Sequence, residues 1–235
     1  MRSKTPRDEG PTSAEVVLVT GGEGCIGAWA VRNLALAGIE VVSTDLAPFG
    51  SRLRKILNID AHSGIHYEQA DLREPEKVAS LIQQYGITRV VHLAAMQVPF
   101  VAADPVRGAE VNVLGTLRVL EAVRNSGGAV RGLSYASSAA AVGPQDAPHE
   151  PETLYGVFKL GNEHAARIYA RDYGVPSLGL RPCIVFGPTR DQGLTSALTT
   201  ALKAVALRSK FEIPFSGPVD VQFAEDVAAA FIQSA

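Results

Sequence analysis

The stretch Val16-Val17-Leu18-Val19-Thr20-Gly21-Gly22-Glu23-Gly24-Cys25-Ile26-Gly27 decides the fold of this chain. The apolar run at 16–19 predicts a buried strand, and the apolar pattern over 26–37 predicts a helix. The glycines at 22, 24 and 27 have the G-x-G-x-x-G spacing, which lets backbone approach a pyrophosphate and directs helix N–H groups at it. A tight turn that uses glycine only for backbone freedom is the alternative, but the flanking strand and helix favour a dinucleotide site.

A second signature, Tyr155-Gly156-Val157-Phe158-Lys159, lies in the second half of the chain. Because residues four apart share one face of a helix, the Lys159 ammonium can lie near the Tyr155 phenol and stabilise its anion. A phenolate can then remove a proton from a substrate hydroxyl. The alternative is a surface pair on an exposed helix, which would leave the dinucleotide site without a proton carrier.

Between and beyond these signatures, strand patterns alternate with helical patterns. We expect strands over residues 15–20, 40–44, 65–69, 88–93, 130–136 and 176–181, and helices over 26–37, 75–85, 105–125 and 153–173. The strands are almost wholly apolar, which is typical of a parallel sheet covered on both faces. We therefore predict an α/β fold, a Rossmann-like doubly wound parallel sheet that binds its ligands at the carboxyl ends of the strands.

Asp45 ends the second predicted strand, about 20 residues beyond the glycines. A carboxylate there can accept hydrogen bonds from the adenosine ribose hydroxyls and repel a 2′-phosphate, so the predicted cofactor is NAD rather than NADP. Two alternatives stay open. Asp45 can cap a turn ahead of Pro48, and Arg52 or Arg54 can meet a phosphate.

The chain divides into three parts. Residues 1–14 are mostly polar and lack the apolar core of a signal peptide, so we expect a disordered tail. Residues 15–182 are the predicted NAD-binding domain, which includes the Tyr/Lys helix. After Arg181 the regular alternation ends. The chain continues with a helix-like stretch at 194–207, a short apolar run at 211–215 and a predicted helix at 223–233. We expect residues 183–235 to form a partial substrate-binding region.

Composition excludes several function classes. The chain has 235 residues, of which 46% are hydrophobic, so it can bury a full core, and its net charge of −2 favours neither nucleic acid nor an anionic membrane as a partner. It contains no apolar run of about 18 residues that would predict a membrane span. The two cysteines, Cys25 and Cys183, are far apart, which predicts neither a disulfide nor a metal site and favours the cytoplasm. A small-molecule substrate is the expectation that remains.

The order of these motifs resembles that of the extended short-chain dehydrogenases/reductases, the NAD-dependent epimerase/dehydratase family, from about Glu15 to the C-terminus. The resemblance implies a set of cofactor-contacting residues: Gly21, Gly24, Cys25, Ile26, Gly27, Asp45, Asp71, Leu72, Leu93, Ala94, Ala95, Asn112, Tyr155, Lys159 and Pro182. Three of the matched polar residues have simpler alternatives. Asp71 can cap a helix, Asn112 can hydrogen-bond local backbone, and His92 can serve packing.

The resemblance also implies a catalytic serine. Ser138 ends a predicted strand seventeen residues before Tyr155. We choose it over Ser137 because its alignment with residues 139–143 puts it in the reactive position and because neighbouring strand residues point opposite ways. The alternative is that both serines are only caps or core hydroxyls. The predicted catalytic set is therefore Ser138, Tyr155 and Lys159: Tyr155 is the base, Ser138 donates a hydrogen bond to the developing oxyanion, and Lys159 also holds the cofactor ribose.

Two departures from the family pattern bear on the substrate. Ala139-Ala140 follow Ser138 where the family's dehydratases carry Asp-Glu, which disfavours dehydration. Ile184 stands where nucleotide-sugar epimerases present an asparagine, which disfavours a nucleotide sugar. The predicted substrate-contacting residues are Gln97, Ser138 and Arg190, the last for a carboxylate or phosphate. A plain loop at Gln97 and a solvated Arg190 are the alternatives.

The resulting prediction is an NAD-dependent oxidoreductase or epimerase that acts on a hydroxyl-bearing carbon of a sugar or sugar derivative. The alternative is a non-catalytic NAD-binding sensor or scaffold. The resemblance further implies a homodimer, and it implies more C-terminal structure than this chain has past residues 219–227. Three explanations of that difference stay open: a shallow pocket, a pocket completed by a partner, or a fragment of a longer polypeptide. The sequence does not decide between an epimerase and a dehydrogenase.

Overall fold

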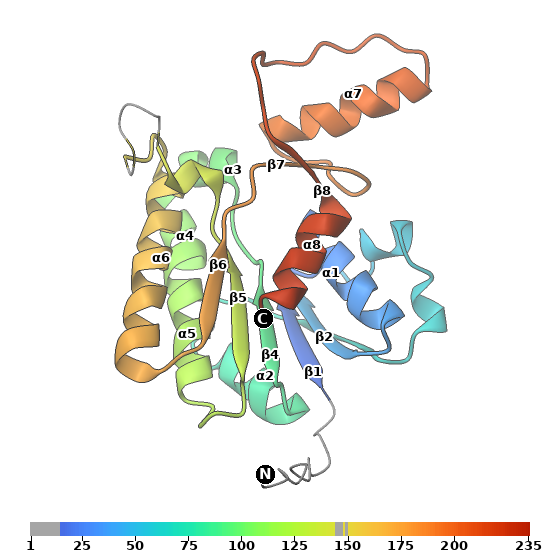
Figure 1. Cartoon of the computed structure of the whole chain (residues 1–235). Helices are drawn as coiled ribbons and strands as arrows, with labels where there is room; N and C mark the ends of the chain where they lie inside the picture. Colours follow the sequence, from blue (N-terminus) through green and yellow to red (C-terminus); the bar gives the residue numbers. More distant parts are fainter. Residues whose placement is uncertain (1–14, 144–147, 149) are drawn as a thin grey trace, which may run out of the picture.

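A computed structural model describes residues 15–143, 148 and 150–235, so the expected tail at 1–14 lies outside the described residues. Its centre is a six-stranded parallel sheet in the order β3-β2-β1-β4-β5-β6 (Figure 1). The strands are β1 Val16–Thr20, β2 Glu40–Asp45, β3 Ile65–Gln69, β4 Arg89–His92, β5 Gly132–Ala136 and β6 Ser177–Leu180. The strand order reverses beside β1, which is where a doubly wound sheet binds its ligand. The predicted Rossmann-like fold is confirmed.

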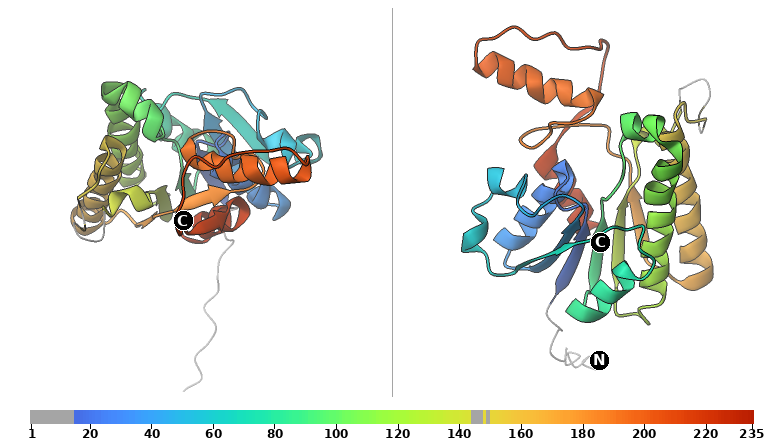
Figure 2. Two further views of the ribbon diagram at one scale, coloured as in Figure 1. Left: turned by 90° about the horizontal axis from the view of Figure 1, so that it is seen from above. Right: turned by 180° about the vertical axis from the view of Figure 1, so that it is seen from behind.

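Helices cover both faces of this sheet (Figures 1 and 2). One face carries α2, α5 and α6, and the other carries α1 and α8. Because side chains alternate along a strand, Leu18 of β1 packs into the first core and Val17 and Val19 pack into the second. These helices are α1 Cys25–Leu36, α2 Lys77–Tyr85, α5 Gly115–Arg124, α6 Leu154–Tyr173 and α8 Ala224–Gln233.

The helix expected over residues 105–125 is interrupted. It consists of α4 (Pro105–Ala109), one π-helical turn over Glu110–Leu114, and then α5. Residues for which no element was predicted form a further short helix just before it, α3 (Val98–Ala103), with a proline in its first turn. The π turn places one extra residue in the helix, and such turns often lie at functional sites.

The last part of the chain leaves the sheet and returns to it. Strands β7 (Ile184–Phe186) and β8 (Val221–Phe223) form a separate two-stranded parallel sheet, and α7 (Ala197–Ala206) stands away from the body of the molecule (Figure 1). The apolar run at 211–215 forms no strand. Helix α8, which we expected in the substrate-binding region, packs on α1, and its Phe231 is fully buried in the core of the sheet.

Within the described part of the chain, none of the helices is both long enough and apolar enough to cross a membrane.

Candidate NAD and catalytic site

The glycine-rich turn joins β1 to α1 at the carboxyl edge of the sheet. Gly21 has a φ of +73°, and a Cβ there would lie 2.6 Å from the backbone nitrogen of Ala94. A Cβ at Gly27 would lie 2.0 Å from the carbonyl oxygen of Gly21, so both positions require glycine. Helix α1 begins at Cys25, with Gly24 as its N-cap. Because Gly24 has no side chain to cap the helix, the N–H groups of the first turn are available to an anion.

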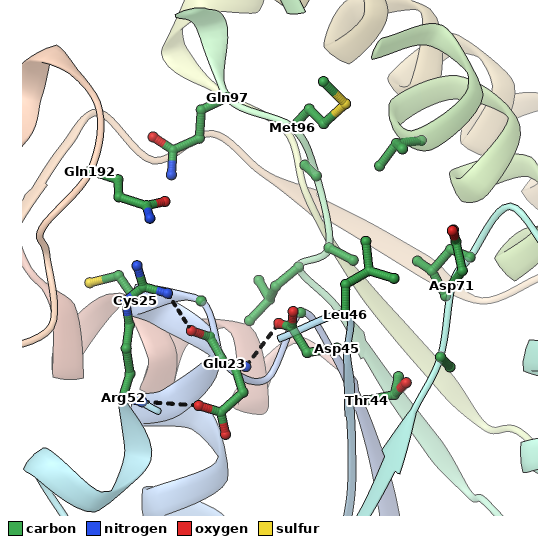
Figure 3. Close-up of a pocket in the computed structure, with 18 of the residues that line it drawn as sticks. Glu23, Cys25, Thr44, Asp45, Leu46, Arg52, Asp71, Met96, Gln97 and Gln192 are labelled. Atoms are coloured by element: carbon green, nitrogen blue, oxygen red, sulfur yellow. Dashed lines mark hydrogen bonds between the residues drawn. The ribbon is translucent and has the colours of Figure 1, made fainter. Parts of the chain in front are cut away.

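A pocket opens over this turn (Figure 3). Its walls come from the carboxyl ends of β1, β2 and β4 and from the segment after β7. Eleven of the predicted site residues line it: Gly21, Gly24, Cys25, Asp45, Asp71, Leu72, Leu93, Ala94, Ala95, Gln97 and Arg190. The other predicted residues are not part of this lining: Ile26, Gly27, Asn112, Ser138, Tyr155, Lys159 and Pro182. The wall also contains residues that sequence reasoning missed, among them Glu23, Thr44, Leu46, Met96, Asp191 and Gln192.

Asp45 lies in the pocket wall and also serves the turn. One carboxylate oxygen accepts a hydrogen bond from the backbone N–H of Glu23 (3.0 Å), and the other accepts one from the N–H of Ala47 (3.0 Å). The two nearby arginines that could have met a phosphate are paired elsewhere. Arg52 binds Asp191, and Arg54 forms an ion pair with Asp60, which lies outside the pocket wall. The carboxylate of Asp45 therefore stays in the pocket wall, at the place where we expect the adenosine ribose.

Two other predicted cofactor residues are held by their own neighbours. The carboxylate of Asp71 is bound by the guanidinium of Arg73, whose hydrogen bonds hold the pKa of that carboxyl below its usual value. Asn112 is buried, and its amide accepts from the N–H of Met96 (2.7 Å) and donates to the carbonyl of the same residue (2.9 Å). Asn112 thus fixes the segment after β4 that lines the pocket.

Ser138, Tyr155 and Lys159 come together at the carboxyl end of β5. The Thr153 hydroxyl caps α6 by accepting the N–H of Gly156 (3.1 Å), which sets Tyr155 in the first turn. The Ser138 hydroxyl caps a short 3₁₀ turn by accepting the N–H of Ala140 (3.1 Å), and it lies close enough to Tyr155 to lower the pKa of the phenol. The Lys159 ammonium lies 5.5 Å from the centre of the Tyr155 ring and donates to the carbonyl of Ala136 (2.6 Å).

Burial and charge shift the pKa values of this cluster in opposing directions. Burial raises the pKa of Tyr155, whereas the neighbouring Ser138 hydroxyl and the positive charge of Arg190 lower it. Burial also lowers the pKa of Lys159 to about 8. The sequence predicted Lys159 as the cation that favours the phenolate, whereas in the structure the positive charge that lowers the pKa of Tyr155 is that of Arg190, a residue of the pocket wall.

A buried polar chain lies behind the catalytic cluster. His92, at the end of β4, contacts the hydroxyl of Thr20 through Nδ1 (2.7 Å) and the hydroxyl of Thr116 through Nε2 (3.1 Å). The amide of Asn162 donates to the same Thr116 hydroxyl (3.2 Å) and to the carbonyl of Asn112 (2.8 Å). Burial lowers the pKa of His92 to about 3, so the ring is neutral. His92 therefore packs against its neighbours and orients them, which is the structural role suggested for it above.

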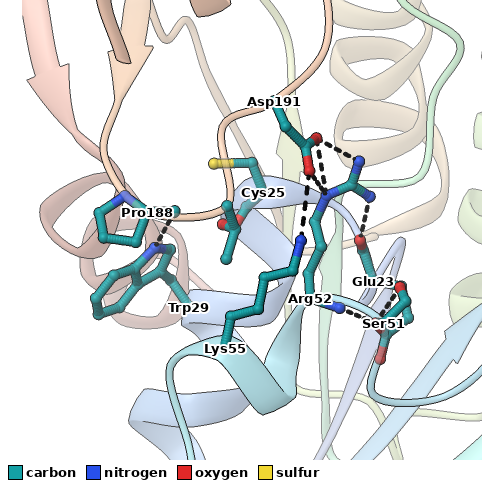
Figure 4. Close-up of polar contacts among 9 residues, drawn as sticks. Glu23, Cys25, Trp29, Ser51, Arg52, Lys55, Pro188 and Asp191 are labelled. Carbon is teal, nitrogen blue, oxygen red and sulfur yellow. Dashed lines mark hydrogen bonds and ion pairs between the residues drawn. The ribbon is translucent and has the colours of Figure 1, made fainter. Parts of the chain in front are cut away.

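Glu23, inside the glycine-rich turn, is the most buried charged residue that sequence reasoning missed. Its carboxylate accepts the N–H groups of Gly50 (2.8 Å) and Arg52 (3.0 Å) and the hydroxyl of Ser51 (2.9 Å). The Arg52 guanidinium donates to the Glu23 carbonyl (2.8 Å) and pairs with Asp191 (2.6 Å), as Figure 4 shows. An acidic residue within a glycine-rich turn was the only signal available in the sequence.

The segment of residues 188–191, which we call the strap, is anchored on α1. The indole of Trp29 donates to the carbonyl of Pro188 (3.1 Å; Figure 4), and the Thr189 hydroxyl donates to the carbonyl of Cys25 (3.5 Å). Thr189 has a φ of 76°, a left-handed conformation that a β-branched residue rarely adopts. Surrounding contacts must hold such a conformation in place, so the strap is a fixed wall of the pocket.

This geometry agrees with the comparison to known families. The model of the NAD dependent epimerase/dehydratase family matches residues 17–235. The chain belongs to that family. It is accordingly an NAD-dependent enzyme of the short-chain dehydrogenase/reductase type, and the glycine cradle, the first turn of α1 and Asp45 fit NAD as its cofactor.

Several known proteins and solved structures are similar to this chain. The UDP-glucose 4-epimerase of Mycolicibacterium smegmatis is 29% identical over 230 residues, which cover 92% of this chain and 72% of that protein. The dTDP-glucose 4,6-dehydratase of Salmonella typhimurium is 25% identical over 198 residues, 73% of this chain and 55% of that protein. Among solved structures, Thermus thermophilus UDP-glucose 4-epimerase in complex with NAD is similar to this chain, with a TM-score of 0.77 and 30% identity. The match covers 93% of this chain and 73% of the epimerase chain.

Proposed function

We propose that this enzyme oxidises a hydroxyl-bearing carbon in a sugar or sugar derivative. As a dehydrogenase it would stop there, and as an epimerase it would then reduce the same carbon again. The observation that carries the proposal is the position of the Tyr155 phenol: the Lys159 ammonium lies 5.5 Å from its ring centre, and the neighbouring Ser138 hydroxyl and the charge of Arg190, a residue of the pocket wall, lower its pKa. A buried phenol with an adjacent hydroxyl and cations is suited to move one proton to and from a substrate oxygen.

The residues of this chain divide the work as follows. NAD, when bound, supplies the hydride acceptor and donor. Tyr155 takes the proton from the substrate hydroxyl, and Ser138 donates a hydrogen bond to the oxygen on which negative charge develops. In the opposite direction, Tyr155 returns the proton to that oxygen. Lys159 is oriented by the Ala136 carbonyl, and it holds the cofactor ribose and keeps a positive charge near the phenol.

Arg190 and Gln97 support a substrate that carries an acidic group. Arg190 donates through Nη2 to the Thr195 hydroxyl (2.8 Å), while its Nε is buried and has no hydrogen-bond partner among the described residues. Gln97 lies beside Gln192 in the pocket wall (Figure 3). A carboxylate or phosphate on the substrate would give the buried Nε its missing acceptor. We therefore propose a sugar acid or sugar phosphate ahead of a neutral sugar.

A substrate panel tests the proposal. Purified protein is incubated with sugars, uronic acids, sugar phosphates and nucleotide sugars, and NADH absorbance is followed together with product stereochemistry. Stoichiometric NADH without an epimer identifies a dehydrogenase, and an epimer without net NADH identifies an epimerase.

The Tyr155→Phe variant is the control for chemistry. It should bind NAD with nearly unchanged affinity and lose turnover, because only the phenol hydroxyl transfers the proton. Wild-type turnover by this variant would remove Tyr155 from the mechanism. A wild-type protein that binds NAD and turns over no member of the panel would instead favour a non-catalytic NAD-binding module.

We propose three further properties that accompany this function. The enzyme acts in the cytoplasm, in keeping with its two separated cysteines. It forms a homodimer through α4, α5 and α6, whose exposed apolar side chains include Val106, Leu114, Val157 and Ile168. Residues 183–223 form the substrate-binding region, while α8 belongs with the NAD-binding domain.

A further inference from the structure

Three side chains of α6, spaced four residues apart, contact three consecutive residues at the end of β5. Tyr155 lies next to Ser138, the Lys159 ammonium donates to the carbonyl of Ala136, and Glu163 accepts the hydroxyl of Ser137. Residues with this spacing lie along one side of a helix. The first two contacts belong to the catalytic set, whereas the third has no role in the mechanism derived above.

Glu163 is firmly held at this position. Its Oε1 accepts from the Ser137 hydroxyl and from Nε of Arg181 (2.7 Å), and its Oε2 accepts from Nη2 of Arg181 (2.6 Å). The hydrogen bonds from Arg181 lower the pKa of the Glu163 carboxyl, so it is ionised at neutral pH. Only 13% of the Glu163 side chain is exposed. Such a bidentate pair fixes the direction as well as the distance of the carboxylate.

The Glu163–Arg181 pair also joins the ends of two neighbouring strands. Arg181 follows β6, and Ser137 follows β5. The N–H of Ser137 donates to the Leu180 carbonyl (2.8 Å), so Ser137 is bound through both its backbone and its side chain. Ser137 is buried, and the next residue along the chain is the catalytic serine.

We propose that Glu163, backed by Arg181, is a positioning residue that fixes Ser138 against Tyr155 by holding Ser137. The inference rests on the proposed function, in which Ser138 contacts the substrate oxygen. A rotation of Ser137 would move the Cα of Ser138 and carry its hydroxyl away from the phenol. When a remote substitution displaces a catalytic group in this way, kcat falls far more than the affinity for the cofactor does.

The Glu163→Gln substitution tests the proposal, since it keeps the size of the side chain and removes the charge. We expect kcat to fall by about 10- to 100-fold with little change in NAD affinity. Because the nearby Ser138 hydroxyl lowers the pKa of Tyr155, moving it away should also shift the rising limb of the pH–rate profile to higher pH. Glu121→Gln is the matched control, as Glu121 lies on α5 and accepts the Tyr169 hydroxyl (2.6 Å) away from β5.

A double-mutant cycle separates positioning from general destabilisation. If Glu163 acts through Ser138, then Glu163→Gln should cause no further loss of kcat in a Ser138→Ala background. Equal fractional losses in both backgrounds would overturn the proposal. Arg181→Lys, which keeps the charge but not the bidentate contact, should fall between wild type and Glu163→Gln.

A second measurement does not need turnover. The Tyr155 phenol can be titrated by NMR of protein labelled at tyrosine, with the signal assigned by its loss in Tyr155→Phe. Its pKa should be higher in Glu163→Gln than in wild type and unchanged in Glu121→Gln. An unchanged Tyr155 titration in Glu163→Gln would overturn the proposal even if the proposed function holds. Failure of every substrate would remove the proposed function but leave this titration to judge Glu163.

Discussion

Arg52 and Asp191 join opposite walls of the NAD pocket, with Arg52 Nη2 2.6 Å from Asp191 Oδ1. The two residues are 139 positions apart in the chain, in the loop after β2 and in the strap after β7. Glu23 holds the Arg52 side of this contact, and the Trp29 indole holds the strap side. The ion pair therefore connects two fixed segments beside the glycine-rich turn, where we expect a dinucleotide phosphate to bind.

The first prediction concerns cofactor release. Arg52→Ala should raise the NADH dissociation rate about two- to fivefold, the scale expected for a partly exposed ion pair. Stopped-flow displacement of NADH, followed by its fluorescence, measures this rate. Asp191→Asn should act in the same direction if the pair itself slows release. A slower release from Asp191→Asn would show instead that Arg52 binds the cofactor phosphates directly.

The second prediction concerns cofactor choice. Asp45→Ala should narrow the preference for NAD over NADP by about tenfold, because the carboxylate repels the 2′-phosphate. Calorimetric titration of both cofactors against both proteins provides the measurement. Asp60→Ala, which removes a carboxylate outside the pocket wall, is the control and should leave the preference unchanged. A wild-type protein that prefers NADP would contradict the role of Asp45.

The third prediction is that Lys159→Met stabilises the fold at neutral pH while it removes activity. Burial lowers the pKa of Lys159 from 10.5 to about 8, so the native state resists the charge that the unfolded chain carries. The unfolded state binds more protons between these values, and stability rises with pH across that window. Below pH 8 the buried charge costs about 3 kcal/mol.

Denaturant unfolding of Lys159→Met at pH 7 and at pH 10 measures this effect. The gain over wild type should be large at pH 7 and much smaller at pH 10. The exposed Lys203→Met serves as control and should show no such pH dependence. An equal gain at both pH values would mean that packing, rather than charge burial, sets the stability of this site.

The fourth prediction is that His92 makes the fold sensitive to acid. Its pKa is about 3 in the native state, against 6.5 for an exposed histidine, because burial disfavours the charged ring. The unfolded state therefore takes up a proton that the native state does not, and stability falls as the pH drops below 6.5 and keeps falling towards pH 3. The expected slope from this residue is about 1.4 kcal/mol per pH unit.

His92→Gln should flatten that slope in urea denaturation series between pH 6.5 and 4, although it costs stability at neutral pH through the lost contacts. His164→Gln, on an exposed part of α6, is the control and should retain the wild-type slope. If His92→Gln unfolds as steeply with acid as wild type, another group is responsible for the acid response.

The sheet and the glycine-rich turn could be predicted from the sequence because their signals are local. Apolar runs identify buried strands, and Gly21 and Gly27 are required by close contacts within one strand–turn–helix unit. The Tyr155/Lys159 pair was equally visible, since helical spacing places both side chains. Asp45 could be named from its place at the end of a predicted strand, and Leu93, Ala94 and Ala95 from the family resemblance, whereas Thr44 and Leu46 beside Asp45 were not named.

Other parts depend on contacts between segments far apart in the chain. The return of α8 to the sheet is decided by Phe231 packing against α1, which no local pattern reveals. The strap is held by Arg52 and Trp29, each more than 130 positions away. Likewise, the pattern over 105–125 indicated one continuous helix, because a single inserted residue hardly alters the apolar periodicity.

That inserted residue has a consequence for how the chain tolerates change in length. In the π turn, the N–H of Gly115 donates to the carbonyl of Glu110. The carbonyl of Asn112 accepts hydrogen bonds from two side chains, the amide of Asn162 and the hydroxyl of Thr116. Deleting one residue here would restore a regular helix and rotate everything after it by about 100°. The core side chains of α5 would then turn away from the sheet, or Asn112 would turn away from Met96. We therefore expect this helix to tolerate substitutions better than a single-residue deletion. The π turn sets the rotation of α5 relative to Asn112, and so the orientation of the core side chains relative to the pocket.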